Sequence, residues 1–296
     1  MRVTQSMLSN NMLRNLTTNY NKMGKLNEQL TSQKKVSRPS DDPVVAMRGL
    51  AYRTQVDKVE QYQRNLGEVN NWLDSSDDAL DKVGAAMHRA KELVTNMANT
   101  GAMTDGDREK IRAELDQLRQ QIQDTANTKV GDKYLFSGTK TGTALFGDFD
   151  NDGKKRYPTD AEIGKGFTSD VNIDVFDGVQ LNVNSKAAKM FKDIDGIFDK
   201  LKDTSTDTDA MIGEIDAMMD TVLTERADLG ARQNRAELMN NRLESQAGIA
   251  KKQMSQNEDI DIEKVITELI TQESVNRAAL SAGARIIQPS LVDFLR

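Results

Sequence analysis

The chain has 296 residues and a net charge of -6, and its residue types exclude several classes of protein. It has no cysteine, which excludes disulfides and thiolate chemistry, and its single histidine, His88, leaves little imidazole for zinc sites or acid–base catalysis. The acidic balance argues against a general nucleic-acid binder. Charged residues make up 29% of the chain and aromatic residues 5%, which favours long solvated helices over a large compact core.

The start of the chain is basic, since Glu28 is the only acid among residues 1–38. A basic amphipathic start can also be an organelle transit peptide, which is an alternative interpretation here. No apolar run is long enough to cross a membrane, and no charged stretch is followed by the apolar region of a secretory signal peptide. The sequence therefore predicts no membrane partner, and either a cytoplasmic location or an unusual export route.

The first segment reads as an amphipathic helix with a coiled-coil seam. Its apolar residues recur at alternating steps of three and four, namely Leu13, Leu16, Tyr20, Met23 and Leu30, with Asn27 in the one gap. Pro39 ends this pattern, because proline disfavours helical geometry in the residue before it.

A second, much longer helix is expected to begin at Pro43. Asp42 is a good N-cap, and proline fits the first helical position, where no N–H is needed. If it runs to Thr100, the helix is about 85 Å long. Its heptad seam consists of Leu66, Val69, Leu73, Leu80, Val83, Met87, Val94 and Met97, with Ser76 and Ala90 in the gaps.

A break follows at Gly101, and the residues from Thr104 to Asp107 restart the chain as a third helix. This helix is expected to end near Gly131 and to form an antiparallel hairpin with the second.

The character of the chain changes at residues 136–185, where glycines cluster and alternating apolar residues replace the helical pattern. Asp177 and Gly178 lie between two such alternating runs, which is a strong β-hairpin signal. We therefore expect a small inserted β domain.

Helical patterns return after the insert, and the last helix is expected to begin near Asp261. Pro289 breaks it and leaves an apolar tail. The sequence thus predicts a mainly α fold with a small inserted β domain, in an elongated nested architecture of terminal coiled-coil helices around a long-helix bundle. The expected domains are 1–42, 43–135, 136–185, 186–255 and 256–296.

One candidate metal site lies inside the β insert. Asp148, Asp150, Asp152 and Gly153 match the front half of a calcium loop, but Thr159 stands where the bidentate glutamate should follow. A polar loop between strands explains the same residues. The sequence carries no nucleophile elbow, phosphate loop or dinucleotide fingerprint, so we expect neither an enzyme nor a bound cofactor.

Six stretches of the sequence resemble the flagellin superfamily. They are residues 1–7 (MRVTQSM), 29–32 (QLTS), 38–43 (RPSDDP), 134–141 (YLFSGTKT), 228–235 (DLGARQNR) and 282–291 (AGARIIQPSL). The last stretch is similar to the branch that joins hook and filament rather than to true flagellin. The likeness covers roughly the first 140 and last 90 residues.

This resemblance implies a structural subunit outside the cell that polymerises as one ring between another hook-associated junction protein and flagellin. It also implies export through the flagellar secretion channel without a cleaved signal, assisted by a cytoplasmic export chaperone. Two alternatives stay open, namely a divergent flagellin of the filament and a cytoplasmic coiled-coil binding module.

The terminal segments pose a physical problem of their own. The apolar stripe of one short helix barely offsets the entropy of ordering it, so the ends should become ordered when neighbours cover their stripes. We therefore predict an assembly interface at both ends of the chain. It comprises Leu13, Leu16, Tyr20, Met23, Leu30, Ile262, Ile266, Leu269, Leu280, Ile286, Ile287, Leu291 and Phe294.

Overall fold

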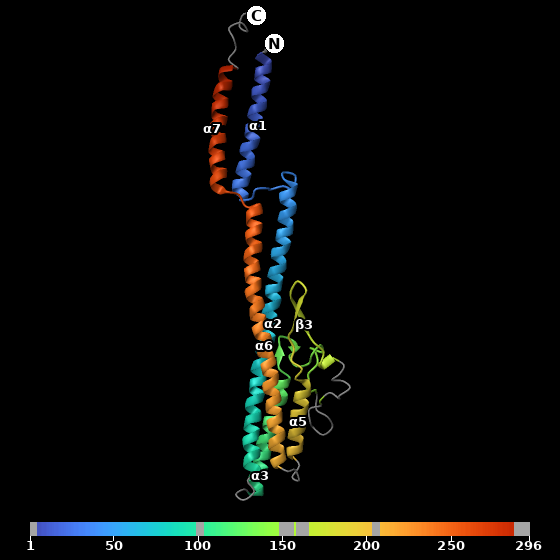
Figure 1. Cartoon of the computed structure of the whole chain (residues 1–296). Helices are drawn as coiled ribbons and strands as arrows, with labels where there is room; N and C mark the ends of the chain where they lie inside the picture. Colours follow the sequence, from blue (N-terminus) through green and yellow to red (C-terminus); the bar gives the residue numbers. More distant parts are fainter. Residues whose placement is uncertain (1–4, 99–103, 148–156, 158–165, 203–207, 287–296) are drawn as a thin grey trace, which may run out of the picture. The chain divides into compact units, whose positions relative to one another are not determined.

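The computed structural model describes residues 5–98, 104–147, 157, 166–202 and 208–286 (Figure 1). They divide between two compact units, of which the first comprises residues 1–58 and 246–296, and the second residues 59–245. Most of the described chain is helical, and its strands form two small antiparallel hairpins. The prediction of a mainly α fold with a small β insert is confirmed.

Helix α2 (Pro43–Ala98) begins where the sequence predicts. The Asp42 carboxylate accepts hydrogen bonds from the backbone N–H groups of Val44 and Val45, at 3.0 and 3.1 Å. These bonds satisfy donors that have no partner inside the helix, and Pro43 needs none. The Asp-Pro pair therefore fixes the start of the longest helix.

The heptad seam predicted for α2 is the core of the second unit. All of its residues from Leu66 to Met97, including Ser76 and Ala90 in the gaps, are buried. Helix α6 (Thr208–Glu258) faces it with a seven-residue repeat of its own. The buried residues of that repeat are Ile215, Val222, Leu229, Ala236, Leu243 and Ala250.

Two shorter helices complete the bundle of the second unit, α3 (Asp105–Ala126) and α5 (Ala188–Lys202). Arg119 of α3 joins them. Its guanidinium donates to both carboxylate oxygens of Asp195, at 2.6 and 2.7 Å, and to Asp199 at 2.7 Å. The Arg119 side chain is only 7% exposed, so this charge depends on its partners.

Helix α3 starts as predicted and ends earlier than predicted. Thr104 is its N-cap, and its hydroxyl accepts from the Asp107 N–H at 3.3 Å. The helix stops at Ala126 rather than near Gly131, because the Asn127 amide pairs with the backbone N–H and C=O of Phe146. A small hairpin of β1 (Lys129–Val130) and β2 (Lys133–Tyr134) follows.

The predicted hairpin is present, with β3 (Asn172–Phe176) paired to β4 (Val179–Asn182). Gly178 in its turn has a φ of +73°, a conformation that favours glycine. Asn65 of α2 donates to the Asp174 carbonyl at 2.7 Å, and the Arg242 guanidinium of α6 stacks 4.2 Å from the Phe176 ring centroid. The hairpin is thus fixed onto the two long helices.

Replacing Arg119 with leucine should lower the free energy of unfolding by about 3–5 kcal/mol, because it leaves Asp195 without its cationic partner. Urea denaturation followed by circular dichroism measures the loss. Lys82→Ala is the matched control, since its pair with Asp78 is exposed and should contribute less than about 0.5 kcal/mol. Equal losses in the two variants would contradict the structural role of Arg119.

Candidate assembly interface

The first unit contains an antiparallel pair of helices, α1 (Gln5–Ser32) and α7 (Ile262–Ile286), which lie side by side (Figure 1). Their contact residues repeat every three and four positions on both helices, as in a coiled coil. On α1 they are Met12, Leu16, Asn19, Met23, Leu26 and Leu30. On α7 they are Val265, Leu269, Gln272, Asn276, Ala279 and Gly283.

The predicted interface residues fall into two groups around this seam. Leu16, Met23, Leu30 and Leu269 lie in it and are partly covered. Five others are 40–54% exposed, namely Leu13, Tyr20, Ile262, Ile266 and Leu280. The Ile286 side chain and Ile287, Leu291 and Phe294 lie outside the described residues, as do Asp148, Asp150 and Asp152.

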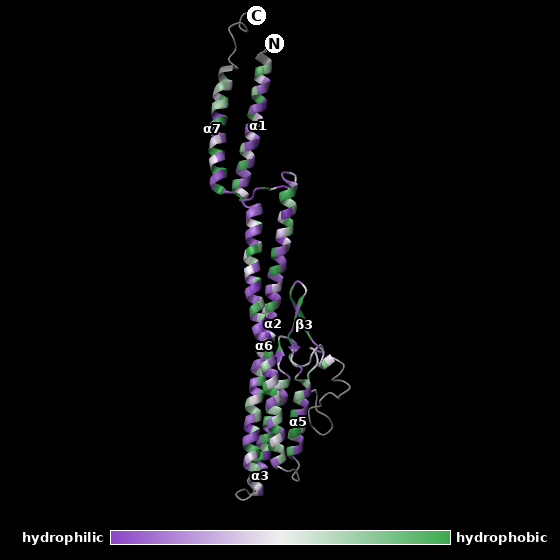
Figure 2. Ribbon diagram, viewed as in Figure 1, coloured by the Kyte–Doolittle hydropathy of each residue, from purple (hydrophilic) through white to green (hydrophobic). Residues whose placement is uncertain are grey.

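The two sides of the pair differ in polarity. One side carries a groove of about 530 Å³ lined largely by polar residues, among them Lys22 and Gln29 of α1 and Glu268 of α7. At about 100° per residue, Leu13 and Tyr20 fall on the other side of α1. Ile262 and Ile266 likewise fall on the side of α7 away from Glu268. We call this the apolar face of the α1–α7 pair, and green hydrophobic residues recur along both helices in Figure 2.

The seam itself is unusually polar at its middle. Gly283 lies against Met12, where an added Cβ would come within 2.8 Å of the methionine Cε. Seven residues later on α1 and seven residues earlier on α7, this antiparallel register places Asn19 opposite Asn276. Asn276 is buried, and its side-chain oxygen has no hydrogen-bond partner among the described residues. An unpaired buried oxygen weakens the pair.

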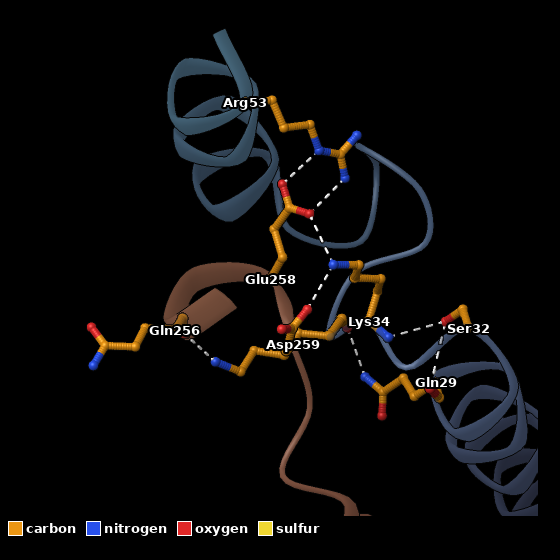
Figure 3. A network of polar contacts seen from close by, with 8 residues as sticks. Gln29, Ser32, Lys34, Arg53, Gln256, Glu258 and Asp259 are labelled. Carbon is orange, nitrogen blue, oxygen red and sulfur yellow. Dashed lines mark hydrogen bonds and ion pairs between the residues drawn. The ribbon is translucent and has the colours of Figure 1, made fainter. Parts of the chain in front are cut away.

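Charged residues hold the connections where α1 and α7 meet the long helices (Figure 3). The Glu258 carboxylate accepts from Arg53 at 2.8 and 2.7 Å, and Lys34 lies 3.4 Å from it. Lys34 also donates to Asp259 at 2.6 Å. Gly49 makes room for Glu258, because an added Cβ would lie 2.6 Å from its carboxylate oxygen. We call Lys34, Arg53, Glu258 and Asp259 the connection network.

Backbone contacts reinforce this network. The Lys35 N–H donates to the Glu258 carbonyl at 2.7 Å, and the Ile260 N–H donates to the Gln33 carbonyl at 3.2 Å. Hydrogen bonds from Arg53 hold the pKa of Glu258 below its ordinary value, against the opposing effect of burial. Hydrogen bonding to Lys34 lowers the pKa of Asp259 in the same way.

Three exposed apolar residues on α2 are not among the interface residues predicted from the sequence. Val44, Met47 and Leu50 are 56%, 76% and 71% exposed. Their three-residue spacing at the start of α2 indicates an apolar side of the helix. The sequence prediction for α2 used only the longer heptad seam that begins at Leu66.

Other kinds of site are not apparent in the described part of the chain. No cluster of three or more His, Asp or Glu side chains there could hold a metal ion. Among the same residues, no helix is long and apolar enough to span a membrane.

Comparisons of the sequence with known proteins agree on one family. The model of the bacterial flagellin N-terminal helical region matches residues 3–141, and that of the C-terminal helical region matches residues 212–295. Flagellar hook-associated protein 3 of Escherichia coli (strain K12) is 27% identical over 308 residues, which cover 94% of each chain. Flagellin of Bacillus subtilis (strain 168) is 26% identical over 303 residues, which cover 97% of each chain.

A solved structure extends the likeness to the fold. The crystal structure of flagellar hook-associated protein 3 from Legionella pneumophila aligns with a TM-score of 0.59 over 70% of this chain and 98% of its own. The two sequences are 14% identical, so this match shows the fold alone.

Replacing Asn276 with leucine should strengthen the α1–α7 pair by about 1–3 kcal/mol, because it removes a buried oxygen that has no partner. Hydrogen exchange at the α7 amides measures the gain in protection. Ser281→Leu adds a similar side chain at an exposed position of α7 and should leave the protection nearly unchanged. Lower protection in Asn276→Leu than in the parent chain would contradict this account of the seam.

The connection network should weaken in acid. A carboxyl whose pKa is lowered by folding adds stability above its unfolded pKa, and that stability is lost as the pH falls through the lowered value. For Glu258 the unfolded value is 4.5, so protection of the Lys35 and Ile260 amides should fall below that pH.

Glu258→Gln should show reduced protection of both amides already at neutral pH, since an amide cannot replace the charge that faces Arg53 and Lys34. Glu268→Gln, on the exposed groove side of α7, is the control and should keep the parent profile. Protection factors at Lys35 and Ile260 that stay constant from neutral to acidic pH in the parent chain would rule the network out as the holding contact.

Proposed function

The chain belongs to the flagellin superfamily, and from this membership we propose that it is a structural subunit of the bacterial flagellum that joins the hook region to the filament. The observation that carries the proposal is the match to a flagellar hook-associated protein 3 along 94% of both chains. The family's role is structural, and we assign the chain no catalytic activity.

A flagellin of the filament is the second candidate. The Bacillus subtilis flagellin is almost as similar as the hook-associated protein, at 26% against 27% identity. The stretch at residues 282–291 favours the junction branch. Copy number separates the two candidates, because a filament subunit is abundant in purified flagella and a junction subunit amounts to one ring.

The proposed mechanism is assembly through the terminal helices. The apolar face of the α1–α7 pair exposes Leu13, Tyr20 and Ile266, which a neighbouring subunit would cover. We propose that the predicted interface residues act in this way, including those beyond the described part of the chain. Burial by the neighbour would remove the apolar face from water, and the ends would then become fully ordered on assembly.

The partners follow from the same role. We propose a ring of copies of this chain, in contact with the other hook-associated junction protein on one side and flagellin on the other. The family membership further supports export through the flagellar channel without a cleaved signal, with a cytoplasmic chaperone on a terminal segment. The five domains 1–42, 43–135, 136–185, 186–255 and 256–296 are our proposed division of these tasks.

A deletion strain tests this function. Cells that lack the chain should build hooks, fail to attach filaments and release flagellin into the medium. The parent gene should restore filaments, whereas a variant with Leu13→Glu and Tyr20→Glu should not, because two carboxylates cannot be buried in an apolar contact.

Asn21→Glu is the matched control, since it adds a carboxylate to α1 at an exposed polar position, and it should restore filaments. The Leu13/Tyr20 variant should still reach the medium, which shows that export is intact. Normal filaments in the deletion strain would overturn the proposed function. Normal filaments with the Leu13/Tyr20 variant would overturn the assigned interface.

A further inference from the structure

The outward side of α2 is apolar over its first turns. Val44, Met47 and Leu50 point away from the side on which buried Gly49, Val56 and Val59 lie. Polar residues take over this side from Thr54 onward. We call Val44, Met47 and Leu50 the α2 patch. Three large apolar side chains together, each more than half exposed, mark an interaction surface rather than a scattered surface residue.

A second patch of similar extent lies at the beginning of α7. Ile262, Ile266 and Ile270 are 46%, 40% and 59% exposed, and they recur every four residues on one side of the helix. We call them the α7 patch. Each patch spans about two turns of helix, or roughly 10 Å, so each matches the footprint of one helix crossing another.

The connection network holds both patches near one end of the terminal pair. The α2 patch starts directly after the N-cap Asp42, and Asn257 donates to the Val45 carbonyl at 3.0 Å. The α7 patch starts directly after Asp259 and Ile260, which Lys34 and Gln33 hold. Both patches therefore lie beside the same set of contacts.

The charges beside the two patches are complementary. Arg48 adjoins Met47 on α2, and Glu263 adjoins Ile262 on α7. Neither side chain has an ion-pair partner among the described residues. An α2 patch thus suits an α7 patch better than it suits another α2 patch.

We infer that the α2 patch of one copy docks on the α7 patch of the next copy, with Arg48 facing Glu263. Because the two surfaces differ, the contact is heterologous, and its repetition builds a ring when the rotation between neighbouring copies closes. The inference rests on the proposed junction function and names the contact by which its ring would form.

The absence of cysteine makes the contact directly testable by crosslinking. Flagella are isolated from cells whose only copy carries both Met47→Cys and Ile266→Cys, treated with a short bismaleimide and blotted for the chain. A heterologous contact should give a ladder of linked multimers, while each single-cysteine variant should stay monomeric. The matched control carries Met47→Cys and Thr271→Cys, since Thr271 lies on the exposed groove side of α7, outside the α7 patch.

Charge reversal adds a second measurement. Arg48→Glu in the double-cysteine chain should reduce the ladder severalfold, and Glu263→Arg in the same chain should restore it. Dimers from Met47→Cys alone would show a symmetric contact and overturn the inference. So would a link within one chain, or a ladder of equal strength in the control.

The outcomes also separate this inference from the proposed function. Chains present in flagella with attached filaments but without a ladder would leave the junction function standing and remove this contact. Chains missing from the flagella of motile cells would remove both.

Discussion

The buried carboxylate of Glu258 is the contact on which the arrangement of the terminal helices depends. It receives two hydrogen bonds from Arg53, a residue 205 positions earlier in the chain, and its own carbonyl receives the Lys35 N–H. Gly49 leaves the space that this carboxylate occupies. One residue thus ties together the end of α6, the start of α2 and the connection that follows α1. Without its carboxylate, Arg53 and Lys34 would lose the anion that they share.

The terminal pair and the long-helix bundle bury their apolar side chains to different extents. In the second unit, the heptad seam of α2 faces the seven-residue repeat of α6, and the residues of both are buried. In the first unit, a two-helix pair has only one contact seam, so apolar residues beside that seam stay exposed. Under the proposed assembly, the first unit therefore gains more stability from neighbouring subunits than the second unit does.

Much of the fold could be predicted from the pattern of residues close in sequence. The features that could not be predicted share a cause, which is contact between residues far apart in sequence. The heptad of α2, the Asp42-Pro43 start and the Asp177-Gly178 turn each depend on residues close in sequence, and each is present. Periodicity also identified the apolar stripe of α1, but it could not tell that α7 covers Leu16 and Met23 and leaves Leu13 and Tyr20 exposed. That choice depends on the register of a helix more than 200 residues away, as does the role of Glu258.

The positions of polar and apolar residues in the terminal pair support the proposed contact with neighbouring subunits. Asn276 lies in the seam with an oxygen that has no partner, while Ile262, Ile266 and Ile270 face water. A helix pair selected for stability alone would place isoleucine inside and asparagine outside. A polar residue in a coiled-coil seam specifies register at a cost in stability. An apolar outer face restores stability once a second copy covers it. This distribution supports the proposal that a neighbouring copy covers the apolar face of the α1–α7 pair in the assembled flagellum.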